Sequence, residues 1–118
     1  MLQKLNRLTK KKDFESVFKN GASFKSFPMI LRIARNGLKR SRFAFVISVK
    51  VSKKAVERNK TRRLASEAIR LNLGKIKGGF DAVFIVLPGA KILDYMSAEK
   101  NIISLLIKAK AAANHKNV

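Results

Sequence analysis

Hydrophobic residues recur along the chain at spacings that alternate between helical and extended periods. Within residues 11–20 the apolar positions lie three or four apart, which predicts a short helix. Thr9 is the candidate N-cap of this helix, and Gly21 is the candidate left-handed residue that ends it. The pattern therefore predicts that a helix precedes the first strand.

Extended segments follow this helix. Residues 29–35 and 42–51 are rich in β-branched and aromatic residues and are separated by an Asn-Gly turn at 36–37. Residues 23–26 are either a loop or the start of a strand, and residues 80–87 form a buried apolar strand later in the chain. We expect the early strands to form an antiparallel meander of two or three members.

A long central helix is predicted over residues 53–71, because neither Gly nor Pro interrupts this segment and Gly74 follows it. Ser52 is its candidate cap. The apolar stripe of this helix is narrow, so most of its surface is expected to face water or a charged partner. The stripe consists of Val56, Leu64, Ala68 and Ile69.

The last helix is predicted to open at Ser97, with Glu99 near its positive end and lysines near its negative end. Its apolar face consists of Ile102, Ile103, Leu106 and Ala109, with Ala113 at the end. The order is therefore helix, two or three strands, helix, strand, helix. This order is typical of an α+β fold in which helices cover one sheet in a two-layer sandwich.

Length and charge narrow the class of protein. The 118 residues are expected to form a single domain over 1–118, with its core at about 5–110 and a loose tail at 114–118. Twenty-seven Lys and Arg against seven Asp and Glu give a formal net charge of +20. A chain this basic is expected to bind a polyanion, and nucleic acid is the commonest one in a cell.

The absence of cysteine excludes disulfides and cysteine-containing zinc sites. The first residues lack the apolar stretch of a signal peptide, and no apolar run approaches the roughly 18 residues of a membrane span. These observations predict a cytoplasmic protein without a membrane partner.

The central helix is strongly basic, and its charges repeat at the spacing of one helix face. One row of residues four apart carries Lys54, Arg58, Arg62 and roughly Ser66. Like charges at this spacing destabilise a helix by about 0.2–0.5 kcal/mol per pair, which favours a phosphate-binding row over a merely solvated face. Asn59 adds a donor and an acceptor for a base edge or a ribose hydroxyl.

The basic helix lies within a longer motif. Residues 48–64 read SVKVSKKAVERNKTRRL and contain a match to Ala-Val-x-Arg-Asn-Arg-x-Lys-Arg. Residues 8–21 supply Leu-Thr-Lys, Asp-Phe, Val-Phe and a glycine upstream, and residues 80–90 supply Phe-Asp-Ala-Val and Leu-Pro-Gly-Ala downstream. In these three separated motifs the chain resembles the bacterial ribonuclease P protein family, over about residues 5–110.

The resemblance implies an α-β-β-β-α-β-α fold with a four-stranded sheet and a left-handed crossover. Crossovers are right-handed in about 98% of cases, so periodicity alone would not predict this. The resemblance also implies that the partner is a large catalytic RNA and that the pair removes the 5′ leader of precursor transfer RNA. The chemistry is then expected in the RNA, with Mg²⁺ in the RNA–protein holoenzyme and no cofactor held by the protein itself.

The resemblance assigns two groups of residues to RNA. The basic helix and its flanking loop are implied to bind the catalytic RNA through Lys50, Lys53, Lys54, Arg58, Asn59, Lys60, Arg62, Arg63 and Arg70. The leader is implied to lie in a cleft between the first helix and the sheet, bordered by Phe14, Phe18 and Arg32. Ordinary core packing is an equal alternative for the two phenylalanines, which lie four apart on one helix face.

The chain departs from the family pattern at four positions. Lys60 replaces an arginine, which keeps the charge but loses a planar donor fork. Val51 replaces a lysine, Ser66 replaces an arginine, and Arg32 stands where an aromatic residue is frequent. These departures bear on individual RNA contacts.

Other functions fit the sequence less well. A self-sufficient nuclease needs clustered carboxylates or histidines, whereas the acids here are scattered and the only histidine, His115, lies in the predicted tail. Asp13 is expected to support the first helix, with contact to a metal hydrated on RNA as an alternative. The runner-up function is a structural RNA-packing protein of the ribosomal type. A duplex-DNA regulator ranks last and no DNA partner is expected, because a helix-turn-helix pattern is lacking.

Overall fold

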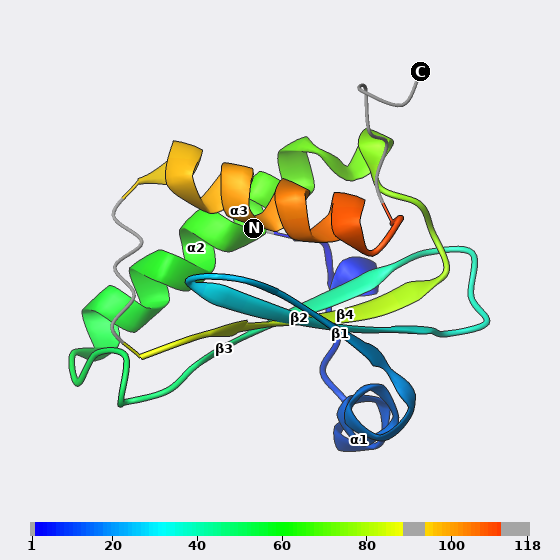
Figure 1. The fold of residues 1–118 in the computed structure, drawn as a ribbon, viewed down its shortest axis with the longest axis horizontal. Helices are drawn as coiled ribbons and strands as arrows, with labels where there is room; N and C mark the ends of the chain where they lie inside the picture. Colours follow the sequence, from blue (N-terminus) through cyan, green and yellow to red (C-terminus); the bar gives the residue numbers. More distant parts are fainter. Residues whose placement is uncertain (1, 89–93, 112–118) are drawn as a thin grey trace.

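The computed structural model describes residues 2–88 and 94–111, which form an α+β fold around a four-stranded sheet (Figure 1). The elements follow the order that the family resemblance implies. They are α1 (Lys11–Asn20), β1 (Ala22–Ser26), β2 (Met29–Arg35), β3 (Arg42–Ile47), α2 (Ala55–Leu71), β4 (Phe80–Val86) and α3 (Tyr95–Lys108), with short 3-10 helices η1 (Lys4–Asn6) and η2 (Leu73–Lys75).

The strand order is β1-β2-β4-β3, so the last strand in the sequence lies between the second and the third. β2 pairs antiparallel with both β1 and β4, whereas β3 runs parallel to β4. The predicted antiparallel meander is therefore wrong for β3, which pairs with β4 and not with β2. The chain leaves β3 earlier than predicted and forms a turn in which the Val51 N–H donates to the Ser48 carbonyl at 3.0 Å.

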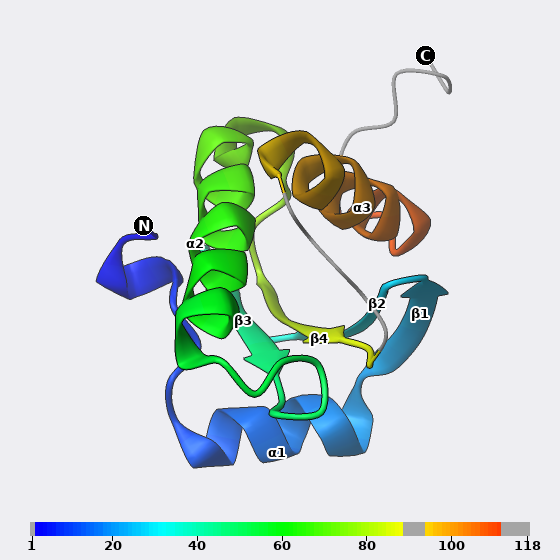
Figure 2. The same cartoon turned by 90° about the vertical axis from the view of Figure 1, so that its left-hand side faces the viewer.

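The connection from β3 through α2 to β4 is a left-handed crossover. In Figure 2 both strands run toward the viewer, α2 lies above the sheet, and β4 lies to the right of β3. Proteins rarely adopt this hand, because twisted strands and right-handed helices favour the opposite one. Here the crossover brings the start of α2 close to the carboxyl end of β3, which places the basic helix beside one edge of the sheet.

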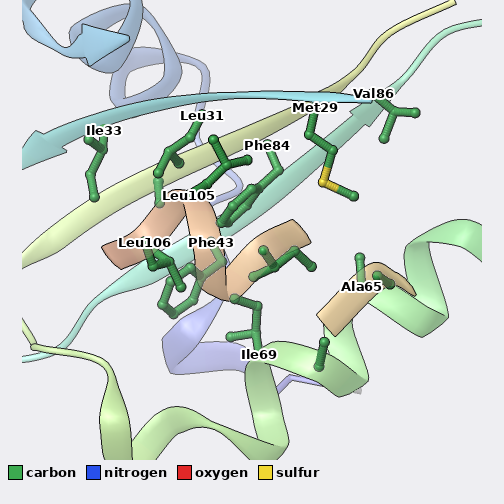
Figure 3. Packing of buried hydrophobic residues seen from close by; sticks show 14 of the residues in the cluster. Met29, Leu31, Ile33, Phe43, Ala65, Ile69, Phe84, Val86, Leu105 and Leu106 are labelled. Atoms are coloured by element: carbon green, nitrogen blue, oxygen red, sulfur yellow. The ribbon is translucent and has the colours of Figure 1, made fainter. Parts of the chain in front are cut away.

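The face of the sheet beneath α2 and α3 carries the main core (Figure 3). Met29, Leu31 and Phe84 are fully buried there, and Phe45 stacks on Phe84 with ring centroids 5.5 Å apart. Alternate residues of the same strands point to the opposite face. On that face α1 packs only locally, around the buried Val83, so the second face is only partly covered (Figure 1).

The bounds of α1 agree with the prediction, but its two ends differ from it. Lys10, not Thr9, precedes the first turn, and its side chain makes no cap hydrogen bond. Gly21 ends the helix with extended backbone, at a φ of −81°, instead of the left-handed conformation. Glycine is favoured there because a Cβ would overlap the Val17 carbonyl oxygen.

The last helix begins two residues before Ser97, because Asp94 is the true N-cap and accepts a hydrogen bond from the Ser97 N–H at 2.8 Å. The sequence prediction missed this role of Asp94. The buried face of α3 consists of Ala98, Ile102, Leu105 and Leu106. The predicted Ile103 and Ala109 are only partly buried, and Ala113 and the tail at 114–118 lie outside the described residues.

The apolar stripe of α2 was predicted partly wrongly. Ala68 and Ile69 are fully buried and Leu64 is half-buried, but Val56 is 76% exposed. Nine residues at 100° each place Val56 about 180° away from Ala65, the core residue that the prediction missed.

Across residues 2–88 and 94–111, no helix combines the length and apolar character needed to cross a membrane.

Candidate nucleic-acid interface

Ser52 holds the loop at 48–54 against the first turn of α2. Its hydroxyl accepts a hydrogen bond from the Lys54 N–H at 3.2 Å and donates one to Glu57 at 3.1 Å. Its carbonyl accepts a hydrogen bond from Arg58 Nη1 at 2.8 Å. Lys54 is the N-cap residue, so Ser52 orients the start of the basic helix without being its cap.

The predicted basic row does not stay on the surface along its length. Arg58 and Arg62 are half-buried, and Ser66 is only 7% exposed. The row therefore turns toward the core, and Ser66 is too buried to contribute to an RNA-binding surface. Asn59, Lys60 and Arg63, next to this row, are exposed.

Most cations of this region have no acidic partner within the described chain. Lys54 lies 3.9 Å from Glu57, and Arg70 pairs with Glu67. The hydrogen bond with Arg70 lowers the pKa of Glu67 to about 2. We call the remaining residues, which form no ion pair with a described residue, the basic ridge: Lys50, Lys53, Arg58, Lys60, Arg62 and Arg63. Unpaired positive charge is thus concentrated in the loop and the first half of α2.

Two arginines of the basic ridge are oriented by uncharged oxygens. Arg58 donates to the Ser52 carbonyl, and Arg62 Nη1 donates to Asn59 Oδ1 at 3.1 Å. These partners fix the guanidinium groups without neutralising them. A side chain that is already ordered loses less entropy when it binds a ligand.

The residues predicted to border the leader lie at α1, on the second face of the sheet. Phe14 is half-buried and packs around Val83 together with Leu8 and Val17. Phe18 is 42% exposed. The two rings, although four residues apart, are therefore in different environments: Phe14 is largely a packing residue and Phe18 is largely a surface residue.

Arg32 of β2 lies next to Phe18. Its guanidinium carbon is 5.9 Å from the centre of the Phe18 ring, within the range of a cation–π contact, and Nη2 donates to the Phe18 carbonyl. The Nε of Arg32 is buried and has no hydrogen-bond partner among the described residues. Arg32 therefore presents a partly unsatisfied cation at the carboxyl end of α1.

Beyond Arg32 the same face of the sheet is apolar and incompletely covered. Ile30, Ile85 and Val46 are cross-strand neighbours on β2, β4 and β3, and none of them is buried. The exposed ring of Phe18 and the cation of Arg32 adjoin this strip of apolar side chains. Such a surface can stack bases and pair with one phosphate, without reading a sequence.

A charged cluster that the sequence prediction missed joins α1 to the sheet. Arg42 Nε and Nη2 donate to the Asp81 carboxylate, and Arg42 Nη1 donates to Asp13 Oδ2 at 3.2 Å. Asn36 donates to Asp81 Oδ1 at 2.9 Å. The signal in the sequence was a single acid, Asp81, within an otherwise apolar strand.

The carboxylates of the described residues do not form a magnesium site. Asp13 and Asp81 both bind the guanidinium of Arg42. In the part of the chain that the structure describes, no three His, Cys, Asp or Glu side chains gather closely enough to hold a metal ion. A divalent ion would therefore need ligands from outside these residues.

A basic helix on one side of a sheet, and a partly covered apolar face with an exposed ring on the other, define an RNA-binding α+β protein. A family model described as Ribonuclease P matches residues 2–110. The chain is 38% identical to the ribonuclease P protein component of Alkaliphilus metalliredigens over 109 residues, which cover 92% of this chain and 97% of that protein.

Solved structures agree with this match. The RNase P protein of Thermotoga maritima is 31% identical and superposes with a TM-score of 0.76, covering 86% of this chain and 96% of that one. A mutant RNase P protein of Staphylococcus aureus superposes with a TM-score of 0.83 at 25% identity, covering 91% and 90%. The chain therefore belongs to the ribonuclease P protein family.

Proposed function

We propose that this chain is the protein component of a cytoplasmic ribonuclease P, in which it binds the ribonuclease P RNA and the 5′ leader of precursor transfer RNA. Family membership supports the assignment to this endoribonuclease. The observation that carries the division of roles is structural: the basic ridge lies along α2 and the loop before it, and the exposed ring of Phe18 lies on the opposite face of the sheet.

The ribonuclease P RNA is proposed to bind the basic ridge together with Asn59, Lys54 and Arg70. The ridge offers cations that no described acid neutralises, and oriented guanidinium groups suit phosphate oxygens. Lys54 and Arg70 contribute less in this proposal, because each shares its charge with a glutamate. Most of this binding energy is expected to come from phosphates and therefore to depend on salt.

The single-stranded leader is proposed to lie on the sheet face beside α1. Phe18 offers its ring to a base, and Arg32 offers a cation to the adjacent phosphate. Phe14 supports the wall of this site from within the small core below α1. In this arrangement the protein recognises that a leader is present more than which bases it contains.

The bond cleavage is proposed to take place in the RNA, with Mg²⁺ bound mainly by RNA phosphates. Asp13 and Asp81 are engaged by Arg42, and in this proposal the described chain supplies binding and positioning groups. The matched relatives give no support to the alternative of a structural RNA-packing protein.

Reconstitution tests this proposal directly. The purified chain, the ribonuclease P RNA of the same genome, and both together are incubated with a precursor transfer RNA at low Mg²⁺ concentration. We expect efficient release of the leader only from the mixture. Cleavage by the purified chain alone would contradict catalysis by the RNA, and a mixture no faster than the RNA alone would contradict the role of this chain as its protein component.

A further inference from the structure

Helix α1 has a small apolar contact with the second face of the sheet. Among the ten residues of α1, all of which the structure describes, only Val17 is buried. It packs in one cluster with Leu8 and with Val83 of β4. The helix lies across the strands on this face (Figures 1 and 2). Because so little apolar surface is buried there, other groups must contribute to the orientation of α1.

Two arginines of the sheet bind α1, one near each end. Arg42 of β3 donates from Nη1 to Asp13 Oδ2 at 3.2 Å, in the first turn of the helix. Arg32 of β2 donates from Nη2 to the carbonyl of Phe18, three residues before Gly21 ends the helix. An acid near the positive end and a cation near the negative end both suit the helix dipole. Since β2 and β3 lie on opposite sides of β4, the two contacts flank the apolar one.

Arg42 is itself held in place by the strands. Its Nε and Nη2 donate to the Asp81 carboxylate at 2.8 and 2.6 Å, and Asp81 is its direct partner in the register of β3 and β4. Asn36 donates to the same carboxylate at 2.9 Å. These bonds fix the plane of the guanidinium, so that the remaining nitrogen, Nη1, is directed at Asp13. Asp13 is thus tied to a group that cannot move independently of the sheet.

The bond to Asp13 restricts rotation of α1 about its own axis. Asp13 and Val17 are four residues apart, so both lie on the face of α1 that contacts the sheet. Phe18 lies 100° farther round the helix. A rotation of about 20° moves a side-chain atom that lies roughly 6 Å from the axis by about 2 Å. Arg32 limits such a rotation less, because a helix carbonyl points along the axis.

We propose that Asp13 and Arg42 are positioning residues of the leader site: the bond between them fixes the rotation of α1 and thereby places the Phe18 ring beside the open sheet face. This inference rests on the proposed function. Neither residue contacts the leader in this role. The Asp13 carboxylate is occupied by Arg42, and its side chain is only 27% exposed, which favours positioning over the alternative of contact with a metal hydrated on RNA.

The binding of two transfer RNAs by the reconstituted RNA–protein complex tests the inference. We expect Asp13→Ala to weaken the binding of precursor transfer RNA roughly 2- to 10-fold, the usual range for a residue that acts through a neighbour, and to leave the binding of mature transfer RNA unchanged. The affinity of the chain for the ribonuclease P RNA should also be unchanged, because Asp13 lies on the face of the sheet opposite to α2.

Glu15→Ala is the matched control. It removes the same charge from the same helix, but Glu15 is exposed and pairs only weakly, at 3.9 Å, with Lys11 of α1. Loss of an acid makes a chain more attractive to RNA, so electrostatics alone predicts slightly tighter binding by both variants. Weaker binding of the precursor by Asp13→Ala and not by Glu15→Ala is therefore a sign of displacement, not of charge.

A double-mutant cycle shows whether Asp13 acts through Phe18. In a Phe18→Ala background there is no ring left to place, so Asp13→Ala should cause no further loss of precursor binding. A carboxylate that contacted the RNA, or a metal on it, would instead cause the same loss with and without the ring. The size of the coupling thus separates positioning from direct contact.

The outcomes separate this inference from the function on which it rests. Equal effects of Asp13→Ala and Glu15→Ala would overturn the inference, and so would a loss that persists undiminished without Phe18. Equal weakening of precursor and mature transfer RNA by Asp13→Ala would overturn it as well, because Asp13 would then support the fold in general. The proposed leader site itself fails only if Phe18→Ala alone does not weaken precursor binding selectively.

Discussion

Arg42 and Asp81 face each other as direct partners on the parallel strands β3 and β4, and the guanidinium binds the carboxylate through two nitrogens at 2.8 and 2.6 Å. The Asp81 side chain is only 7% exposed, so the pair is largely removed from water. The hydrogen bond with Asp81 is the main cause that raises the pKa of Arg42. Asp13 of α1 binds the same guanidinium, which makes this cluster a link between α1 and the sheet.

Loss of Asp81 should therefore destabilise the fold. Asp81→Ala leaves Arg42 mostly buried with only the more exposed Asp13 beside it. Removal of one member of a buried ion pair costs about 3–5 kcal/mol, so we expect the free energy of unfolding to fall by roughly 3 kcal/mol. Urea denaturation measures the change. Glu15→Ala, which removes an exposed partner of Lys11, is the control and should change stability by no more than about 0.5 kcal/mol.

Phe18→Ala should weaken leader binding more than it weakens the fold. A stacked base is worth about 1–3 kcal/mol, so we expect precursor transfer RNA to bind the RNA–protein complex about 5- to 150-fold more weakly. Mature transfer RNA, which lacks the leader, should bind as before. Phe14→Ala is the comparison and should mainly lower the free energy of unfolding, because Phe14 packs in the core below α1. Equal weakening of both RNAs by Phe18→Ala would show that its ring does not contact the leader.

Two arginines of α2 allow a matched test of the basic ridge. Arg63 is exposed and forms no ion pair with another described residue, whereas Arg70 is bound by Glu67. Arg63→Ala should reduce the salt slope of binding to the ribonuclease P RNA by about 0.7–0.9, the value of one phosphate contact. Arg70→Ala should reduce it less, because Arg70 already shares its charge with Glu67 and therefore neutralises less phosphate charge. A larger effect from Arg70 than from Arg63 would contradict the assignment of the ridge.

The contact between α2 and α3 should depend on pH. The Tyr95 hydroxyl donates to Glu99 at 2.6 Å, and Asn72 donates to the same carboxylate at 2.8 Å. Tyr95, followed by Asn72, lowers the pKa of Glu99, and the bond with Glu99 raises the pKa of Tyr95 to about 12. Because the pKa of Glu99 is lowered in the folded protein, its ionised form stabilises the fold above the ordinary pKa of glutamate, and this stability is lost in acid. Because the pKa of Tyr95 is raised, its protonated hydroxyl stabilises the fold below pH 10.0, and this stability is lost as the pH approaches about 12.

Tyr95→Phe should therefore cost about 1 kcal/mol of unfolding free energy near pH 7, the usual worth of such a hydrogen bond. The difference from the unaltered chain should shrink below about pH 4 and again above about pH 10. Urea denaturation at acidic, neutral and alkaline pH measures it. A difference that is constant across this range would show that the ionised Glu99 is not the partner that matters.

Local patterns predicted the elements better than their arrangement. Periodicity placed α1 and β2 at their observed bounds, since spacing and turn residues are local signals. The insertion of β4 between β2 and β3 is not local, because it depends on pairs such as Ile30 with Ile85. The hand of the crossover was likewise available only from the resemblance to a family.

The candidate site shows the same difference between features set by local sequence and features set by tertiary packing. The basic character of α2 was evident from composition, but the face it presents was not, because packing against α3 and the sheet sets the rotation of the helix. Ser66 was consequently placed on the surface, although it is buried. The cluster around Arg42 joins residues 29 and 39 positions apart, a separation that no local pattern records.

The place of β4 in the middle of the sheet has a consequence for synthesis on the ribosome. Until residues 80–86 emerge from the exit tunnel, β2 and β3 each lack the neighbour that they share. A nascent chain that ends before them has unpaired strand edges and no closed core, and such intermediates are prone to aggregate. Closure of the sheet must therefore wait until β4 has been translated, and a nascent chain that stalls before residue 80 is exposed to aggregation.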